Sequence, residues 1–209
     1  MKALSILFIL CLFFAGGVDA SEWKSEVLAN VTEADAANCA SYPKVSNLDE
    51  QFLCESLLIK VTNSLYKSWL SDGDKGIKMQ AIDQWWDTKG GSSLRSPLVR
   101  LHLAALIGQG RKNDIMEHRE YTLKYLLSEN ELIKGAAITA LGWVGNCDDV
   151  KAIKLIIKDE QEGIAEKAVL ALLKLVGPYK SEKVLHELTG DLHRESLKRF
   201  IKKQLSTFG

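Results

Sequence analysis

The chain has 209 residues, and its 27 Lys and Arg balance its 27 Asp and Glu, so its formal charge at pH 7 is zero. A balanced charge argues against bulk nucleic-acid binding, which rests on the neutralisation of phosphates. The length suits one or two domains, and a low proline content with abundant Ala, Leu and Lys favours helices.

The first 20 residues, MKALSILFILCLFFAGGVDA, have the layout of a secretory signal peptide. Lys2 precedes an apolar run, and small residues at its end predict cleavage after Ala20. A membrane anchor is the alternative, but the apolar run covers 16 positions, fewer than the roughly 20 that span a bilayer. We therefore expect an exported protein, periplasmic or secreted, with no stable membrane span after cleavage.

Three cysteines remain after this segment, at Cys39, Cys54 and Cys147. Export places them in an oxidising compartment, where disulfides persist. Cys39 and Cys54 flank a short loop that contains Pro43, and we predict that they pair. Closing a loop of about 15 residues stabilises a fold by about 3 kcal/mol in the chain-entropy model. Cys147 is then either a buried or partly buried free thiol, or a site of intermolecular bonding or reactivity.

Apolar residues recur at helical spacing after Asn47, and no convincing period-two strand is present. A long amphipathic helix is predicted over 47–70, where Asn47 and Glu50 make a capping-box-like start. Five residues four positions apart line its apolar stripe: Leu53, Leu57, Val61, Leu65 and Trp69. Shorter helices are predicted near 76–88, 96–109, 113–128, 131–144, 148–158, 162–176, 180–189 and 192–207.

These shorter helices follow one another in pairs, and the second helix of each pair repeats one ten-residue pattern. The four copies are VRLHLAALIG, IKGAAITALG, AEKAVLALLK and LKRFIKKQLS, which begin at Val99, Ile133, Ala165 and Leu197. Their spacings of 34, 32 and 32 residues, with two helices per unit, are typical of an α-solenoid. A further copy from Ile77 lies only 22 residues ahead of the first, and we interpret it as the partner helix of 96–109.

The shared column V-R-x-x-A-A-x-A-L-G-x-x-G resembles the HEAT-like repeats named after phycobilisome lyases, and IKGAAITALGWVG matches it best. The resemblance covers about 96–209 and implies an all-α fold, a curved stack of antiparallel helix pairs. Some members of that family are lyases, and most are interaction scaffolds. The expected division is a signal peptide over 1–20, a disulfide-pinned helical segment over 21–72 and a repeat domain over 73–209.

Small residues in this column have a physical role whether or not the resemblance holds. Alanines near Ala137 let neighbouring helices approach closely. Gly145 and Gly177 suit left-handed helix C-caps, whereas Gly142 lies inside the last turn, where close packing is its expected use.

The segment before the repeats carries a second resemblance. It contains Cys39, then Glu-x-x-Leu-Cys from Glu50 to Cys54, then Asn63-x-x-Tyr66. Over about 39–70 it is similar to the N-terminal domain family shared with a secreted lysozyme inhibitor, a small disulfide-pinned helical unit. That similarity implies a cell-envelope protein and, as one alternative function, inhibition of a lysozyme-type hydrolase.

A search for catalytic and metal-binding patterns finds no convincing constellation. The four histidines show no metal-ligand spacing, and His186 with His193 gives only a weak case for a shared metal. A calcium loop from Asp72 fails because Ile77 occupies the position that needs glycine, so an aspartate-capped turn is favoured. We predict no catalytic, cofactor or metal site and no enzyme activity, with a lyase-like enzyme of unrecognised site as an alternative.

Tryptophans are the first candidates for contacts with a partner protein. Trp85 and Trp86 point about 100° apart on a helix, so one can pack in the core while the other leans outward. Trp143 lies near the edge of a repeat unit. Exposed tryptophans suit binding hot spots, although core packing is the favoured interpretation for each of them taken alone.

Basic residues are the second candidates: Arg100, Lys134, Lys198 and Arg199. Arg100, Lys134 and Lys198 occupy corresponding positions of the repeat, where they line one face or form structural salt bridges. Lys198 and Arg199 belong to the terminal unit, which is either a polar cap of the stack or a basic ligand site. The leading prediction is an exported, non-enzymatic binding or scaffold protein that engages another protein through its helical-repeat surface.

Overall fold

The computed structural model describes residues 20–29, 38–44, 47–87, 96–111, 115–159 and 161–207. These residues form ten α-helices and one short 3-10 helix and contain no strand, which confirms the all-α prediction. The predicted signal peptide, apart from Ala20, lies outside the described residues. The helices are α1 (Ala20–Val27), α3 (Leu48–Leu70), α4 (Lys75–Asp87), α5 (Pro97–Gly110), α6 (Met116–Leu123), α7 (Glu131–Val144), η2 (Cys147–Asp149), α8 (Val150–Asp159), α9 (Glu162–Val176), α10 (Pro178–Asp191) and α11 (Glu195–Ser206).

Most of these boundaries agree with the sequence periodicity, and α7 and α9 begin and end where it places them. Two differences stand out. Helix α1 has no counterpart in the prediction, and α6 ends at Leu123 although the prediction extends to 128. Beyond Leu123 the N–H groups of Tyr125, Leu126 and Ser128 donate three residues back instead of four, so tight turns replace the last helical turns.

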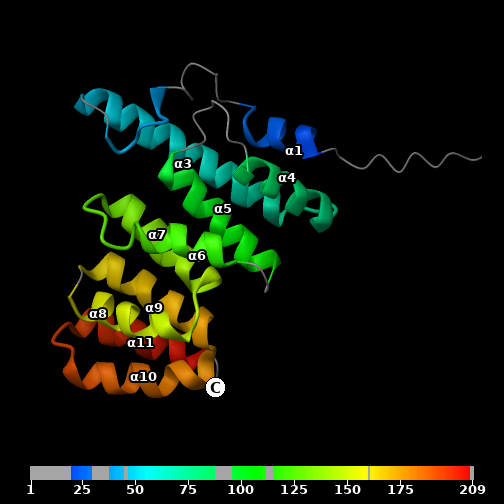
Figure 1. Cartoon of the computed structure of the whole chain (residues 1–209). Helices are drawn as coiled ribbons and strands as arrows, with labels where there is room; N and C mark the ends of the chain where they lie inside the picture. Colours follow the sequence, from blue (N-terminus) through cyan, green and yellow to red (C-terminus); the bar gives the residue numbers. More distant parts are fainter. Residues whose placement is uncertain are drawn as a thin grey trace, which may run out of the picture.

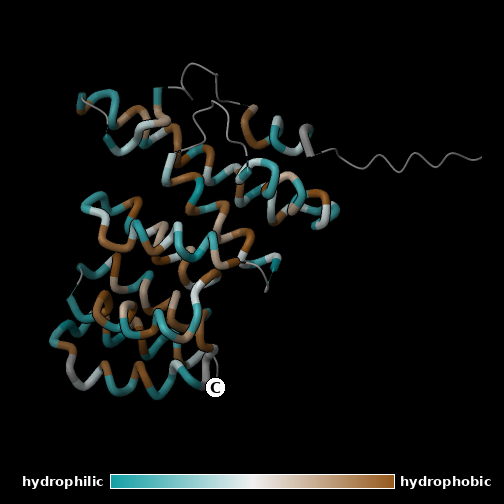
Figure 2. Tube along the Cα trace, in the orientation of Figure 1, coloured by the Kyte–Doolittle hydropathy of each residue, from teal (hydrophilic) through white to brown (hydrophobic). Residues whose placement is uncertain are grey.

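The helices are arranged in a succession of layers (Figure 1). Helix α5 packs on α7, α7 on α9 and α9 on α11, while α4, α6, α8 and α10 pack beside α5, α7, α9 and α11 in turn. Helix α3 lies on α5, and α1 contacts both α3 and α4. One cluster of buried apolar side chains extends from Trp23 to Ile201, and apolar positions recur along every helix of the succession (Figure 2).

Glycines set the separation between successive layers. A Cβ atom added to Gly142 of α7 would lie 2.8 Å from the Cα of Ala171 in α9. One added to Gly108 of α5 would lie 2.8 Å from the backbone carbonyl carbon of Trp143 in α7. Real Cβ atoms do not approach so closely, and the close-packing role predicted for Gly142 is confirmed.

The two predicted glycine C-caps have different outcomes. Gly177 has φ +76° and ψ +163° at the end of α9, so the positive φ that calls for glycine is confirmed, although its ψ lies outside the left-handed helical region. Gly145 has φ −74°, so the left-handed cap predicted there is wrong. A Cβ at Gly145 would lie 2.9 Å from Oδ2 of Asp149, and this glycine is needed for space.

The apolar stripe predicted for α3 is buried along only part of its length. Val61, Leu65 and Trp69 are buried, but Leu57 is half-buried and Leu53 is exposed. Each step of four residues turns the stripe by about 40° around the helix axis, so the stripe rotates by about 160° between Leu53 and Trp69. The prediction is therefore wrong for Leu53, which has rotated to the outer side.

A buried lysine caps the C-terminal end of α3. Lys78 of α4 is 5% exposed, and its Nζ donates to the carbonyl oxygens of Ser68, Ser71 and Asp72 at 2.6, 2.7 and 3.2 Å and to the Ser71 hydroxyl at 3.0 Å. Burial lowers the pKa of this amine. These bonds satisfy acceptors that a helix end leaves without intrahelical partners, so Lys78 fixes α4 against α3.

The turn between α3 and α4 is capped by an aspartate, as predicted. Oδ1 of Asp74 accepts hydrogen bonds from the backbone N–H groups of Gly76 and Ile77 at 2.6 and 3.3 Å. At the other end of α3, Oδ1 of Asn47 accepts from the N–H of Asp49 at 2.9 Å, which confirms the predicted N-cap.

Candidate protein-interaction surface

The disulfide between Cys39 and Cys54 is present, as predicted, and both cysteines are buried. It joins the turn that contains Tyr42 to α3. The Tyr42 side chain is fully buried, and its hydroxyl accepts a hydrogen bond from Nδ2 of Asn130, just before α7, at 3.1 Å. The disulfide-linked turn therefore contacts the residue that precedes α7 as well as α3.

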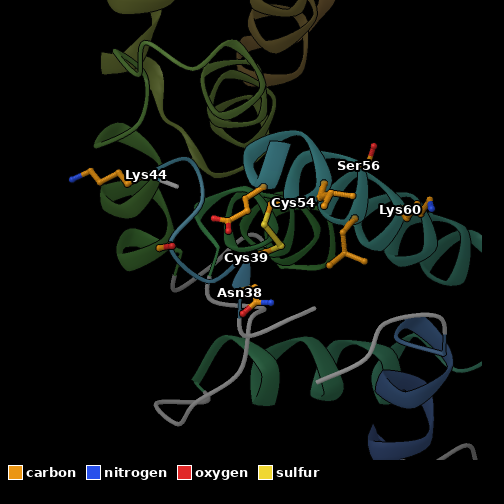
Figure 3. Close-up of a pocket in the computed structure, with 10 residues that line it drawn as sticks. Asn38, Cys39, Lys44, Cys54, Ser56 and Lys60 are labelled. Carbon is orange, nitrogen blue, oxygen red and sulfur yellow. A yellow bond between two sulfur atoms is a disulfide. The ribbon is translucent and has the colours of Figure 1, made fainter. Parts of the chain in front are cut away.

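A pocket of about 520 Å³ lies beside the disulfide. Its lining combines the turn and one side of α3: Asn38, Cys39, Ser41, Lys44, Glu50, Leu53, Cys54, Ser56, Leu57 and Lys60. Figure 3 shows the side chains of Lys44 and Lys60 pointing in opposite directions, away from the disulfide. Because its basic groups diverge, this pocket does not concentrate positive charge on one ligand group.

Cys147 is free and exposed, so the alternative of a buried thiol is wrong. It is the first residue of η2, whose buried side chain is that of Asp149. Both Asp149 carboxylate oxygens accept from the Arg119 guanidinium, at 2.6 and 2.8 Å, and Oδ2 also accepts from the Asn146 N–H. The η2 turn is thus anchored through Asp149, which leaves Cys147 on the outside.

Trp85 and Trp86 are both buried, with 5% and 6% of their surfaces exposed. The core packing favoured for each of them is confirmed, and neither leans outward, because α4 is covered on two sides. Trp23 of α1 meets the Trp85 ring edge to face at 6.5 Å between ring centroids. His118 of α6 lies 4.4 Å from Trp86, between ring centroids. Neither tryptophan offers a surface to a partner.

Arg100 is held between two aromatic rings. Its guanidinium carbon lies 4.2 Å from the centroid of Trp86 and 4.6 Å from that of Tyr121. Nε1 of Trp86 donates to Glu117 at 3.2 Å. Burial raises the pKa of Tyr121. Cation–π contacts of this kind join α4, α5 and α6, so Arg100 serves the packing of the helices.

The other basic candidates lie on different helices, and the structure does not assemble them into one site. Lys134 is half-buried on α7. Lys198 of α11 pairs with Glu195 at 2.8 Å, one turn before it on the same helix. Arg199 is exposed on α11.

A row of side chains crosses four successive helices. The Tyr66 hydroxyl of α3 lies 3.3 Å from Nδ1 of His102 in α5, and the two rings meet edge to face at 5.3 Å. Lys167 of α9 reaches over Gly135 of α7, where an added Cβ would lie 2.5 Å from its Nζ. Burial lowers the pKa of His102 to about 4, with a contribution from the Lys167 charge, and raises that of Tyr66 to about 12.

We expect His102 to make stability depend on pH between about 6.5 and 4. Its pKa is lower in the folded than in the unfolded chain, so the unfolded chain binds the extra proton first as the pH falls. The free energy of unfolding should decrease by about 3 kcal/mol across this window on account of His102. Urea denaturation at several pH values measures it, and His102→Gln should remove this part of the slope. Equal slopes in both proteins would contradict the assignment.

Trp143 is half-buried and next to the exposed side of α9. The ammonium of Lys174 lies 4.7 Å from the centroid of its indole, and burial lowers the pKa of that lysine. Leu170, 37% exposed, lies between Lys167 and Lys174 on the same side of α9, because they are three and four residues from it. We name Trp143, Lys167, Leu170 and Lys174 the α7–α9 face. It combines an aromatic ring, an exposed leucine and two lysines, one of which lies over the ring.

No signal in the ten-residue pattern identifies Leu170 and Lys174 as surface residues, since both fall at positions where other copies carry different side chains.

Within the described ranges, no group of three or more His, Cys, Asp or Glu side chains is placed to hold a metal ion. None of the described helices is long and apolar enough to cross a membrane. Comparisons with family models, with curated proteins and with solved structures found no match for this chain.

Proposed function

We propose that this protein is an exported, non-enzymatic binding protein whose helices form a HEAT-like α-solenoid and whose α7–α9 face contacts a partner protein. The order of helix contacts, with α5, α7, α9 and α11 in succession, supports the solenoid. The disulfide between Cys39 and Cys54 and the apolar N-terminal segment support export.

The observation that carries the binding proposal is the composition of the α7–α9 face. A half-buried tryptophan, an exposed leucine and two lysines lie together on two rigid helices. Aromatic anchors surrounded by polar groups are typical of binding hot spots. Lys167 and Lys174 give this surface a positive potential, so the partner should present carboxylates around an apolar contact.

This surface replaces the tryptophan pair of the sequence-based hypothesis. Trp85 and Trp86 stabilise the interior, and Trp143 is the tryptophan that remains for a partner.

An affinity-capture experiment tests the proposal. The mature protein is immobilised and exposed to proteins from its own exported compartment, alongside Leu170→Asp and the control Leu155→Asp, which alters an exposed leucine of α8. We expect a partner retained by the wild type and by Leu155→Asp. Leu170→Asp should bind it at least about tenfold more weakly, and added salt should also weaken binding.

Two outcomes count against this proposal. Equal capture by all three proteins, or no salt dependence, would exclude the α7–α9 face. If the mature protein instead blocks lysis of cells by lysozyme, and Leu170→Asp blocks it equally well, then the alternative of a hydrolase inhibitor acting through 39–70 replaces it.

A further inference from the structure

Exposed large apolar side chains are concentrated on α3. Five of the nine in the described part of the chain belong to this helix: Leu48, Phe52, Leu53, Ile59 and Leu70, with exposures of 83, 70, 66, 37 and 76%. Soluble proteins rarely leave a contiguous apolar patch uncovered unless it binds something. In Figure 1, α3 lies at one end of the succession of layers, and its N-terminal part projects past α5.

Four of these side chains form a straight line with Tyr66. Leu48, Phe52, Ile59, Tyr66 and Leu70 are separated by 4, 7, 7 and 4 residues. A step of four residues turns by about +40° around the helix axis and a step of seven by about −20°, so all five lie within a sector of about 40°. We name them the α3 stripe, of which four members are exposed and Tyr66 is half-buried, because its ring and hydroxyl also contact His102 of α5. Leu53 lies outside this sector and lines the pocket beside the disulfide.

The spacing of the α3 stripe reads the same in both chain directions. A second, antiparallel α3 centred on Ile59 would therefore place Leu48 against Leu70 of the partner subunit. Phe52 would meet Tyr66 of the partner subunit, and Ile59 would meet its own copy at the two-fold axis. This is the self-complementary pattern that a two-fold symmetric interface requires.

Opposite charges flank the stripe close to symmetry-related positions. Asp49 and Lys67 both lie about 100° around the helix from Leu48, on one flank of the stripe. A two-fold axis perpendicular to the helices at Ile59 keeps that flank on the same side in both copies and places Asp49 opposite residue 69 of the partner subunit. Lys67 of the partner subunit then lies two residues, about 3 Å, along the helix from that point, within reach of the Asp49 carboxylate. Both side chains are exposed, so an ion pair between copies costs little desolvation.

We propose that the α3 stripe is a homodimer interface, in which α3 of two copies packs antiparallel about a two-fold axis at Ile59. A lipid surface is the less fitting occupant, because exposed Asp49 and Glu50 accompany Lys60 and Lys67 along the exposed side of the helix. Membrane-surface helices carry mainly basic residues on that side. The inference goes beyond the function proposed above and does not depend on the α7–α9 face.

Cysteine crosslinking tests the register of this interface. In a Cys147→Ser background, Ile59→Cys should form a disulfide-linked dimer on mild oxidation, because two copies of residue 59 meet at the axis. The control Asn63→Cys should not, because residue 63 of one copy lies opposite residue 55 of the other. Eight residues of helix separate the two cysteines by about 12 Å, beyond the reach of a disulfide. Equal crosslinking of both variants, or none, would overturn the proposed register.

Sedimentation equilibrium tests the association itself. The wild type should show a concentration-dependent dimer, Ile59→Glu should remain a monomer, and Asp49→Lys should weaken association about tenfold. Adding Lys67→Asp to Asp49→Lys should restore it. A monomeric wild type, or an Ile59→Glu protein that still dimerises, would refute the interface. Binding of the wild type to phosphatidylglycerol vesicles that is lost in Ile59→Glu, without dimerisation, would assign the stripe to a lipid surface instead.

Discussion

Replacing Trp86 by alanine should lower the free energy of unfolding by about 4 kcal/mol. The ring is buried, contacts His118, Tyr121 and the Arg100 guanidinium, and donates through Nε1 to Glu117. Truncation leaves a cavity between α4, α5 and α6 and removes one side of the aromatic pair around Arg100. Urea denaturation followed by circular dichroism gives the change.

Two further variants separate the causes of that loss. Trp86→Phe keeps most of the buried ring and should cost about 1–2 kcal/mol. Arg100→Met keeps the packing and removes the cation, so its cost should reflect the cation–π contacts, about 1–2 kcal/mol. If Trp86→Ala costs no more than Arg100→Met, the ring is not a core residue and the description of α4 as covered on both sides is wrong.

Replacing Lys78 by methionine should cost about 3 kcal/mol of stability. The variant keeps the length of the aliphatic stem but removes the ammonium donor from the carbonyl oxygens of Ser68, Ser71 and Asp72. Buried acceptors that lose a charged donor account for a cost of this size. The same denaturation measurement detects it, and amide exchange should be faster in the last turn of α3.

The matched control is Lys60→Met, which alters an exposed lysine of the same helix pair. Its effect should stay within about 0.5 kcal/mol. Similar costs for the two variants would show that Lys78 acts as an ordinary surface lysine.

Periodicity predicts the helices of this protein well, because each apolar stripe must face a neighbour. It also predicts the use of Gly142, since a repeated small residue inside a helical turn has few explanations other than close packing. The disulfide follows from the number of cysteines and the expected compartment. These features depend on local sequence or on simple counting.

The sequence does not predict in the same way which neighbouring helices cover a given helix. The angle between Trp85 and Trp86 gives their directions, but only the positions of α1 and α6 decide that both directions are buried. Lys78 has no sequence signal as a cap, because its acceptors belong to another helix. A search for apolar residues four positions apart does not find the α3 stripe, because two of its steps are seven residues long. A step of seven residues rotates less around the helix axis than a step of four, so the stripe stays closer to one line along the helix.

The contact between Tyr42 and Asn130 has a consequence for how the chain can be divided. In a simple array each unit contacts only its immediate neighbours, so terminal units can be removed with little effect on distant ones. Here the turn joined to α3 reaches past α5 to the start of α7. Cutting the chain between α3 and α4 would therefore expose the first turn of α7, and the helices from α4 to α11 expressed alone would lack part of their own support.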